Sequence, residues 1–191
     1  MRVGVLALQG AFREHVLALE VLGVQAPAIR LPGQMDDLDG LVIPGGESTA
    51  ISKLMVTYGF YEPIVGRVAE GMAVWGTCAG AILIATNVVD GIPGQRGLAL
   101  MDMDVRRNAF GRQKDSFEVD LDFADLDRPY TGVFIRAPRI ERIGPDVTTL
   151  ATHERAIVAA RQGRLMATSF HPELTGDPRV HKYFVEAVVG S

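Results

Sequence analysis

The chain is poor in cysteine, in excess charge and in long apolar runs, and each scarcity excludes a class of protein. One cysteine in 191 residues cannot form an internal disulfide, which favours a reducing, cytoplasmic location. A net charge of −4 argues against a general nucleic-acid or membrane-surface binder. The first apolar run, residues 2–8, is too short for a membrane span. What remains is a globular protein, because 48% of the residues are hydrophobic.

The length predicts one domain over residues 1–191. The sequence contains no internal repeat, low-complexity tract or linker that would divide it. Segment 106–116 (RRNAFGRQKDS) is polar, and we expect it to form a mobile surface loop.

Three short runs rich in Val, Leu and Ile organise the first half of the chain, at residues 2–8, 40–43 and 72–75. Near-continuous apolar strands are typical of a parallel sheet that is buried on both faces. A small-residue turn and a predicted helix follow each run, so the pattern indicates an α/β fold with right-handed crossovers. In such folds functional groups collect beyond the carboxyl ends of the strands, and all three turns lie at that edge.

The predicted helices carry local signals for their ends. The helix after the first run shares an apolar face formed by Phe12, Val16, Leu19 and Leu22. Gly23 is expected to end this helix, and Ser48 or Thr49 to cap the next one. The final helix is expected to start at Pro178 with Asp177 as its cap.

The second half of the chain predicts strands rather than alternating units. We expect strands at 98–106, 116–123, 132–136, 148–152, 155–160 and 164–170. Residues 161–164 (RQGR) are typical of a hairpin turn between the last two of them.

The single cysteine lies in Gly76-Thr77-Cys78-Ala79-Gly80, which fits G-x-nucleophile-x-G between a strand and a helix. The glycines permit a sharp turn in which bulky neighbours of Cys78 would clash. The amino end of the following helix favours a thiolate, and the Ala79 N–H would point to where an oxyanion forms. From this pattern alone, a buried structural cysteine is an equally good interpretation.

A nucleophilic cysteine needs a base, and one histidine stands out. Surface or otherwise satisfied positions are the better interpretation for the others, His15, His153 and His181. His171 follows the last predicted strand, and Pro172 disfavours helix there. In an extended H-P-E, residues 171 and 173 point to the same side, so Glu173 can orient the imidazole. A polar strand end is the alternative, and a metal site is disfavoured because the cysteine pair of zinc deaminases is absent.

The turn PGGES at 44–48 supplies a third element at the same edge. Its glycines allow close backbone approach, and its N–H groups can bind an oxyanion or a polar substrate. Neither a phosphate-loop motif nor G-x-G-x-x-G is present. The order Cys, His, Glu fits neither an α/β-hydrolase nor a papain-like protease.

GTCAG with a distal HPE resembles the class I (triad) glutamine amidotransferases. Longer blocks resemble one branch, the glutaminase subunits of pyridoxal 5′-phosphate synthase (the PdxT/SNO family). They are LALQGAFREH at 6–15, IPGGESTAI at 43–51, WGTCAGAILIA at 75–85, RRNAFGRQKDSFE at 106–118, GVFIRAP at 132–138 and SFHPELTGDPRVHKYF at 169–184. The resemblance runs almost from end to end.

This resemblance implies a three-layer, flavodoxin-like fold with a mostly parallel central sheet and helices on both faces. It also implies hydrolysis of L-glutamine through a glutamyl thioester, with Cys78 as nucleophile, His171 as base and Glu173 as its orienting acid. Backbone N–H groups of Gly46 and Ala79 would form the oxyanion hole. The implied substrate-binding residues are Gly46, Glu47, Ser48, Arg107, Ile135 and Arg136.

By the same resemblance, the ammonia passes to a separate synthase subunit, which is a (β/α)₈ barrel, and no cofactor or metal is expected. We hypothesise that the QGAF loop lies near the docking face, because it leaves the same sheet edge as the catalytic turns. Two alternatives stay open: another cysteine-elbow enzyme of the PfpI type, and a non-catalytic regulatory subunit.

Overall fold

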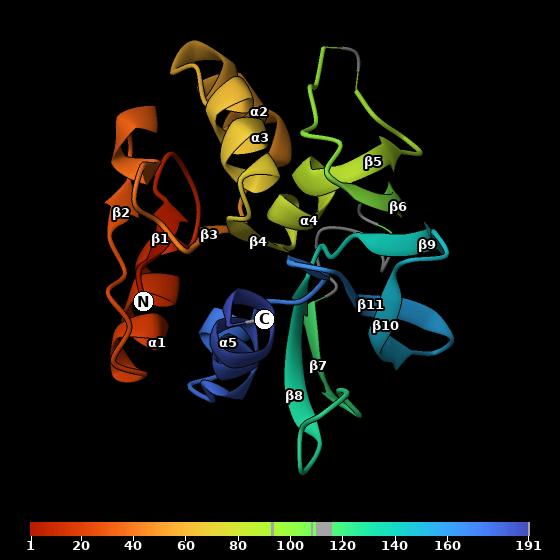
Figure 1. The fold of residues 1–191 in the computed structure, drawn as a ribbon. Helices are drawn as coiled ribbons and strands as arrows, with labels where there is room; N and C mark the ends of the chain where they lie inside the picture. Colours follow the sequence, from red (N-terminus) through yellow and green to blue (C-terminus); the bar gives the residue numbers. More distant parts are fainter. Residues whose placement is uncertain (93, 108, 110–115, 191) are drawn as a thin grey trace.

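The computed structural model describes residues 1–92, 94–107, 109 and 116–190, and it is built around one large twisted sheet (Figure 1). The strands are β1 (Val3–Leu6), β2 (Ala28–Ile29), β3 (Gly40–Ile43), β4 (Ala73–Thr77), β5 (Ala85–Val88), β6 (Met101–Arg106), β7 (Ser116–Leu121), β8 (Tyr130–Ile135), β9 (Arg139–Ile143), β10 (Thr148–His153), β11 (Ala156–Gln162) and β12 (Leu165–Thr168). The helices are α1 (Phe12–Val21), α2 (Ser48–Thr57), α3 (Tyr61–Ala69), α4 (Ala79–Ile84) and α5 (Arg179–Tyr183). Short helical segments are η1 (Pro32–Met35), η2 (Pro172–Leu174) and the π-helical η3 (Phe184–Val189).

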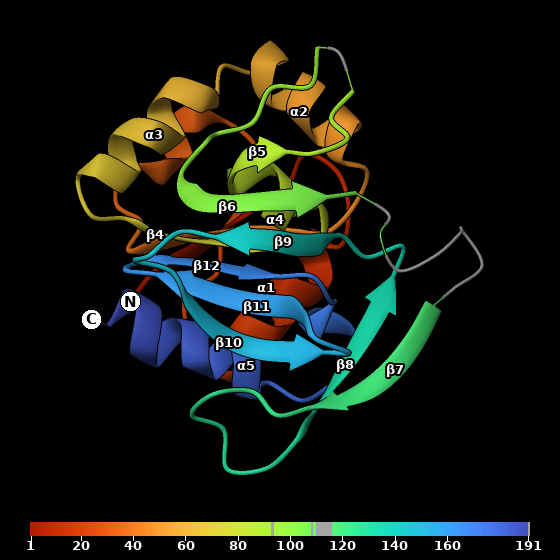
Figure 2. The same cartoon turned by 90° about the vertical axis from the view of Figure 1, so that its right-hand side faces the viewer.

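The sheet has a parallel part and an antiparallel part, in the order β2-β1-β3-β4-β12-β11-β9-β6-β5. Strands β2, β1, β3, β4 and β12 pair in parallel, whereas β11 is antiparallel to β12, β9 and β10. β6 pairs antiparallel with β9 and parallel with β5 at the far edge (Figure 2). β7 and β8 form a separate hairpin.

Helices cover both faces of the parallel part, with α2, α3 and α4 on one side and α1 and α5 on the other (Figure 1). Alternate residues of each strand enter opposite cores, as a pleated strand requires. In β4, Val74 joins the core under α2 and α3, while Ala73 and Trp75 join the core under α1 and α5. The predicted three-layer α/β fold with its mostly parallel sheet is confirmed.

The three strands expected in the first half are present, each followed by its predicted helix. The prediction missed β2, β5, β9 and α3. β2 contains only two residues, too few for a periodic pattern. α3 carries Pro63 and Gly66, which disfavour a helix interior, although Pro63 falls in the first turn, where proline is tolerated.

The ends of the elements were predicted in part. Gly23 follows α1 with a φ of 75°, the left-handed conformation expected of a helix-ending glycine. The hairpin turn is tighter than expected, because Gln162 pairs with Leu165 and only Gly163 and Arg164 remain between them.

The expected cap of α2 is wrong. Glu47, not Ser48 or Thr49, holds the N-cap position, and its carboxylate accepts the backbone N–H groups of Thr49 and Ala50. α5 begins at Arg179, one residue later than expected, and the Asp177 carboxylate accepts the Arg179 N–H at 3.0 Å.

The predicted loop over 106–116 lies mostly outside the described residues, and its two ends, Arg106 and Ser116, belong to β6 and β7. In the described part of the chain, every helix is too short or too polar to cross a membrane.

Candidate active site

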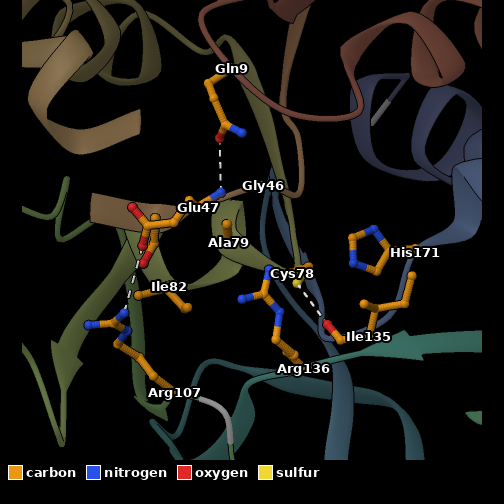
Figure 3. Close-up of a pocket in the computed structure, with 11 residues that line it drawn as sticks. Gln9, Gly46, Glu47, Cys78, Ala79, Ile82, Arg107, Ile135, Arg136 and His171 are labelled. Atoms are coloured by element: carbon orange, nitrogen blue, oxygen red, sulfur yellow. Dashed lines mark hydrogen bonds and ion pairs between the residues drawn. The ribbon is translucent and has the colours of Figure 1, made fainter. Parts of the chain in front are cut away.

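A pocket of about 240 Å³ opens where the turns after β1, β3 and β4 meet the ends of β6, β8 and β12 (Figure 3). Its walls are formed by Gln9, Gly46, Glu47, Ser48, Cys78, Ala79, Ile82, Arg107, Ile135, Arg136 and His171. The structure therefore brings together every predicted site residue around one cavity, except that Glu173 lies behind His171 instead of on the wall.

Cys78 stands on a strained turn between β4 and α4. Its φ is +48°, a conformation that residues other than glycine rarely adopt, and its N–H donates to the Thr168 carbonyl oxygen at 2.8 Å. A side chain at Gly76 would place its Cβ 2.5 Å from the Gly80 carbonyl carbon. A side chain at Gly80 would overlap the Ile43 carbonyl oxygen. The two glycines thus let the elbow pack tightly enough to present the cysteine at the pocket.

His171 and Glu173 form a pair at the end of β12. The backbone N–H of His171 donates to the Val133 carbonyl oxygen at 2.8 Å, and this bond connects the segment after β12 to β8. Its Nδ1 lies 2.8 Å from Glu173 Oε1. The expected extended H-P-E geometry is wrong, because Pro172 starts the 3₁₀ turn η2. That turn, not strand alternation, folds Glu173 back beneath the imidazole.

The charges around His171 favour its protonated form. Burial alone would lower the pKa of this imidazole, because a low-dielectric site disfavours charge. The interactions with Cys78 and Glu173 outweigh burial and raise the pKa to about 10. At neutral pH His171 is therefore an imidazolium held between a sulfur and a carboxylate.

The PGGES turn lies against both the histidine and the first turn of the chain. A Cβ at Gly45 would come within 2.5 Å of His171 Cε1, so a glycine is required for the imidazole to sit where it does. On the other side, the Glu47 N–H donates to Gln9 Oε1 at 2.9 Å (Figure 3). The Ala11 N–H donates to the Gly45 carbonyl oxygen at 3.1 Å.

The opposite wall carries two guanidinium groups. Arg107 Nη2 lies 3.8 Å from Glu47 Oε1 across the pocket. Burial alone would raise the pKa of Glu47, but hydrogen bonds from Thr49 and Ala50, with a smaller effect of the Arg107 charge, hold this pKa below its usual value. Arg136 has a φ of 46°, a strained conformation at the end of β8. The neighbouring Ile135 carbonyl oxygen lies 4.0 Å from Cys78 Sγ.

A sequence model of the SNO glutamine amidotransferase family matches residues 5–190. The chain belongs to this family. It is 56% identical to the pyridoxal 5′-phosphate synthase subunit PdxT of Mycolicibacterium smegmatis, over 97% of this chain and 98% of the relative. It is also 56% identical to the PdxT of Herpetosiphon aurantiacus, over 97% and 99% of the two chains. The family resemblance seen in the sequence is therefore confirmed.

Solved structures agree with this placement. A crystal structure described as glutamine amidotransferase superposes with a TM-score of 0.93 at 49% identity, covering 99% of both chains. The structure of PurLQS from Thermotoga maritima superposes with a TM-score of 0.72 at 16% identity, covering 97% of this chain and 98% of that one. This distant similarity shows the shared fold alone.

Two residues of the amidotransferase pocket were missed by the sequence reasoning. Gln9 lies in the QGAF block but carried no chemical motif, and only the folded turn brings it to Glu47. Ile82 lies one turn into α4, where an apolar residue predicts core packing rather than a pocket wall.

The remaining histidines lie away from the pocket wall. His15 and His181 are both completely buried, so the surface interpretation is wrong for them. Both ring nitrogens of His15 have polar partners, whereas His181 has one through Nε2 and none through Nδ1 in the described part of the chain. His153 ends β10 and packs beside Phe117. Within the described ranges, the structure holds no cluster of three His, Cys, Asp or Glu side chains that could bind a metal.

Proposed function

We propose that the chain hydrolyses L-glutamine to L-glutamate and ammonia through Cys78, His171 and Glu173, within a single glutaminase domain spanning residues 1–191. The observation that carries the proposal is the His171–Glu173 contact of 2.8 Å at a pocket that also contains Cys78 on its positive-φ turn. Membership in the glutamine amidotransferase family supports the choice of substrate.

In the first half-reaction the Cys78 thiolate attacks the side-chain amide carbon of glutamine. The raised pKa of His171 supports this assignment, because the proton of the thiol then already resides on the imidazole. The resulting oxyanion would accept hydrogen bonds from the backbone N–H groups of Gly46 and Ala79, both of which line the pocket. His171 Nε2 donates its proton to the departing nitrogen, so ammonia leaves and a γ-glutamyl thioester remains.

In the second half-reaction a water molecule attacks the thioester. His171 Nε2, now neutral, accepts a proton from this water, and the C–S bond breaks to release glutamate and restore the thiolate. Glu173 remains an anion throughout, holding Nδ1–H and stabilising each imidazolium that forms.

The charges of the pocket suit the head group of a free amino acid. Arg107 and Arg136 offer guanidinium groups to an α-carboxylate, and Glu47 offers a carboxylate to an α-ammonium. Gly46, Ser48 and Ile135 complete the proposed substrate contacts. A peptide-linked glutamine lacks both head-group charges, so we expect free glutamine to be the preferred substrate.

We also propose that the ammonia is passed to a separate synthase subunit, which is a (β/α)₈ barrel that forms pyridoxal 5′-phosphate, in the cytoplasm. The relatives at 56% identity are named as subunits of such a synthase, which supports a complex. Free ammonia would be protonated and diluted in water, so a closed route between the two sites favours its use.

The QGAF loop is the docking element in this proposal. Gln9 and Ala11 are hydrogen-bonded to Glu47 and Gly45, so any movement of the loop on docking reaches the oxyanion turn directly. Partner-dependent activity would follow, because the N–H of Gly46 must point into the pocket to stabilise the oxyanion.

The proposed function is tested by glutamate release, measured with and without the synthase partner, for wild type and Cys78→Ala. We expect the wild-type rate to rise when the synthase is present and the variant to lose at least about 10⁴-fold in kcat. Glutamate release by Cys78→Ala at the wild-type rate would overturn the mechanism. A wild-type protein that releases no glutamate in either condition would overturn the proposed reaction.

A further inference from the structure

A cluster of buried polar side chains lies behind Glu173, on the side away from the pocket. His15 from α1 and His181 from α5 are both completely buried, and His15 Nδ1 lies 2.9 Å from His181 Nε2. The rings of both histidines pack edge-on against Trp75, with ring centroids 5.5 and 5.0 Å from the indole. Two imidazoles inside an apolar core are costly to bury unless their hydrogen bonds are satisfied.

The other nitrogen of His15 faces two elements of the proposed active site. His15 Nε2 lies 3.1 Å from Thr77 Oγ1, which precedes the nucleophile, and 3.3 Å from Glu173 Oε2. The Glu173 side chain is fully buried, and in the described part of the chain its Oε2 accepts no hydrogen bond of good geometry. His15 is thus the polar group placed to serve this oxygen, and it links the cysteine turn to the acid.

The network determines which nitrogen of each histidine carries the proton. If His15 were protonated on Nδ1, its bare Nε2 lone pair would face the Glu173 carboxylate. In that arrangement His181 Nε2 would accept the His15 proton, and the His181 N–H would sit on Nδ1, which has no partner in the described structure. Protonation of both rings on Nε2 removes the first fault and leaves His181 Nδ1 with an unpaired lone pair in place of an unpaired N–H: His181 donates to His15, and His15 donates toward Thr77 and Glu173.

We propose that His15 is a positioning residue of the glutaminase site, which fixes Glu173 through Nε2–H and whose tautomer is set by His181. Such a donor keeps the Glu173 carboxylate in one orientation, so that Oε1 stays aligned with His171 during both half-reactions. His15 is neutral in this arrangement. Burial and the nearby His181 and His171 hold its pKa well below the usual value. The inference rests on the proposed function, but it concerns the orientation of Glu173 and not the choice of substrate.

The first test compares His15→Leu with His15→Gln in glutamate release by the complex with the synthase. Leucine removes the donor, so we expect kcat to fall about 3- to 10-fold, the size of an ordinary hydrogen bond, because the 3.3 Å contact with Glu173 Oε2 is not well aligned; KM should change less than about twofold. In His15→Gln the side-chain amide nitrogen of the introduced residue can replace Nε2 as donor, so we expect this variant to keep most of the kcat that His15→Leu loses.

The matched control is Phe184→Leu, which removes buried volume beside Trp75 and leaves the polar partners of His15 and Glu173 unaltered in sequence. We expect this control to retain the wild-type kcat despite lower stability. Equal losses in His15→Leu and Phe184→Leu, or a wild-type kcat in His15→Leu, would overturn the inference.

A second test depends neither on glutamine nor, in its first readout, on a variant that folds. Nitrogen-15 chemical shifts of the histidines in the wild-type protein report the tautomer, and we expect neutral His15 with its proton on Nε2. A proton on Nδ1 would overturn the inference. Alkylation of Cys78 by iodoacetamide at neutral pH adds a readout: we expect its rate to fall in His15→Leu, because a loosened Glu173 holds the His171 imidazolium less firmly beside the sulfur. An unchanged alkylation rate would contradict this role even if the protein acted on another substrate.

Discussion

Histidines lie on both sides of the Glu173 carboxylate, and their pKa values are shifted in opposite directions. On the pocket side, the pKa of His171 is raised to about 10. On the core side, burial lowers the pKa of His181 to about 4, and that of His15 also falls well below its usual value. Burial acts against protonation in all three residues. His15 also faces Glu173, at 3.3 Å, but it is completely buried beside another imidazole, whereas His171 lies at the pocket and interacts with both Cys78 and Glu173. Depth and partners together therefore decide which histidine is protonated.

Glu173→Gln is expected to reduce the difference in pKa between His171 and the two buried histidines most strongly. The neutral amide removes the charge that holds the imidazolium, and its NH₂ group competes for the place of Oε1 or faces His15. We expect kcat to fall about 10³-fold or more, as for loss of the orienting acid in other triads. The basic limb of the pH–rate profile should also move to lower pH, since the pKa of His171 falls from about 10.

Steady-state glutaminase assays across pH 6 to 11 measure both effects of Glu173→Gln. Glu70→Gln is a suitable control, because that carboxylate lies on the surface at the end of α3 and pairs only with Arg67 in the described structure. If Glu173→Gln kept the wild-type basic limb, the raised pKa of His171 would have another source.

Gly45→Ala is expected to have the next largest effect, about 10²-fold in kcat. The added Cβ would lie 2.5 Å from His171 Cε1 and 3.3 Å from the Cys78 Cβ, so the imidazole must move away from its partners. Small displacements at a reacting group cost this much in other enzymes. The rate of glutamate release and the rate of Cys78 alkylation should fall together.

The matched glycine for that experiment is Gly66 in α3, where an added Cβ meets nothing within 4 Å. We expect Gly66→Ala to keep full activity and to stabilise the protein by about 0.5–1 kcal/mol, as alanine does in a helix interior. Equal losses of activity in the two variants would mean that contact with His171 is not the cause.

The third prediction concerns stability in acid. The folded-state pKa of His181 is about 4, below the ordinary value of 6.5, so its contribution is complete above pH 6.5 and is lost as pH falls toward 4. We expect this loss to reach about 3 kcal/mol. His171 behaves in the opposite way: its contribution is complete below pH 6.5 and is lost as pH rises through about 10.

Urea unfolding at pH 7.5, 6.5, 5.5 and 5.0 measures the acid effect, before most carboxylates titrate. In His181→Leu the free energy of unfolding should depend less on pH over this range. A slope equal to that of the wild type would show that His181 does not carry the acid sensitivity.

The fold could be predicted to the extent that local patterns dictate it. Val, Leu and Ile runs identified β1, β3 and β4, because strands buried on both faces are continuously apolar. β2 and β9 escaped notice because their pairing depends on neighbours that are distant in sequence. Glu47 was not foreseen as a cap, since glutamate is not among the side chains that usually cap helices.

The candidate site shows the same division. Cys78, His171 and Glu173 could be identified because each lies in a short local motif, GTCAG or HPE. The 3₁₀ turn that joins His171 to Glu173 begins beside a backbone hydrogen bond from His171 to Val133, which lies far away in the chain. His15 was assigned to a surface or satisfied position without a role because only long-range contacts with His181 and Glu173 make its burial favourable.

The position of Trp75 makes its fluorescence a reporter of the buried histidines. Trp75 is the single tryptophan of the chain, and its ring packs nearly perpendicular to those of both His15 and His181. Its Nε1 donates to Thr168 Oγ1 at 3.2 Å, so the fluorophore is fixed in the sheet and does not sample solvent. Protonation of either imidazole would place a positive charge beside the excited indole and change its emission. Intrinsic fluorescence can therefore follow the titration of the core in the unlabelled, unmutated protein.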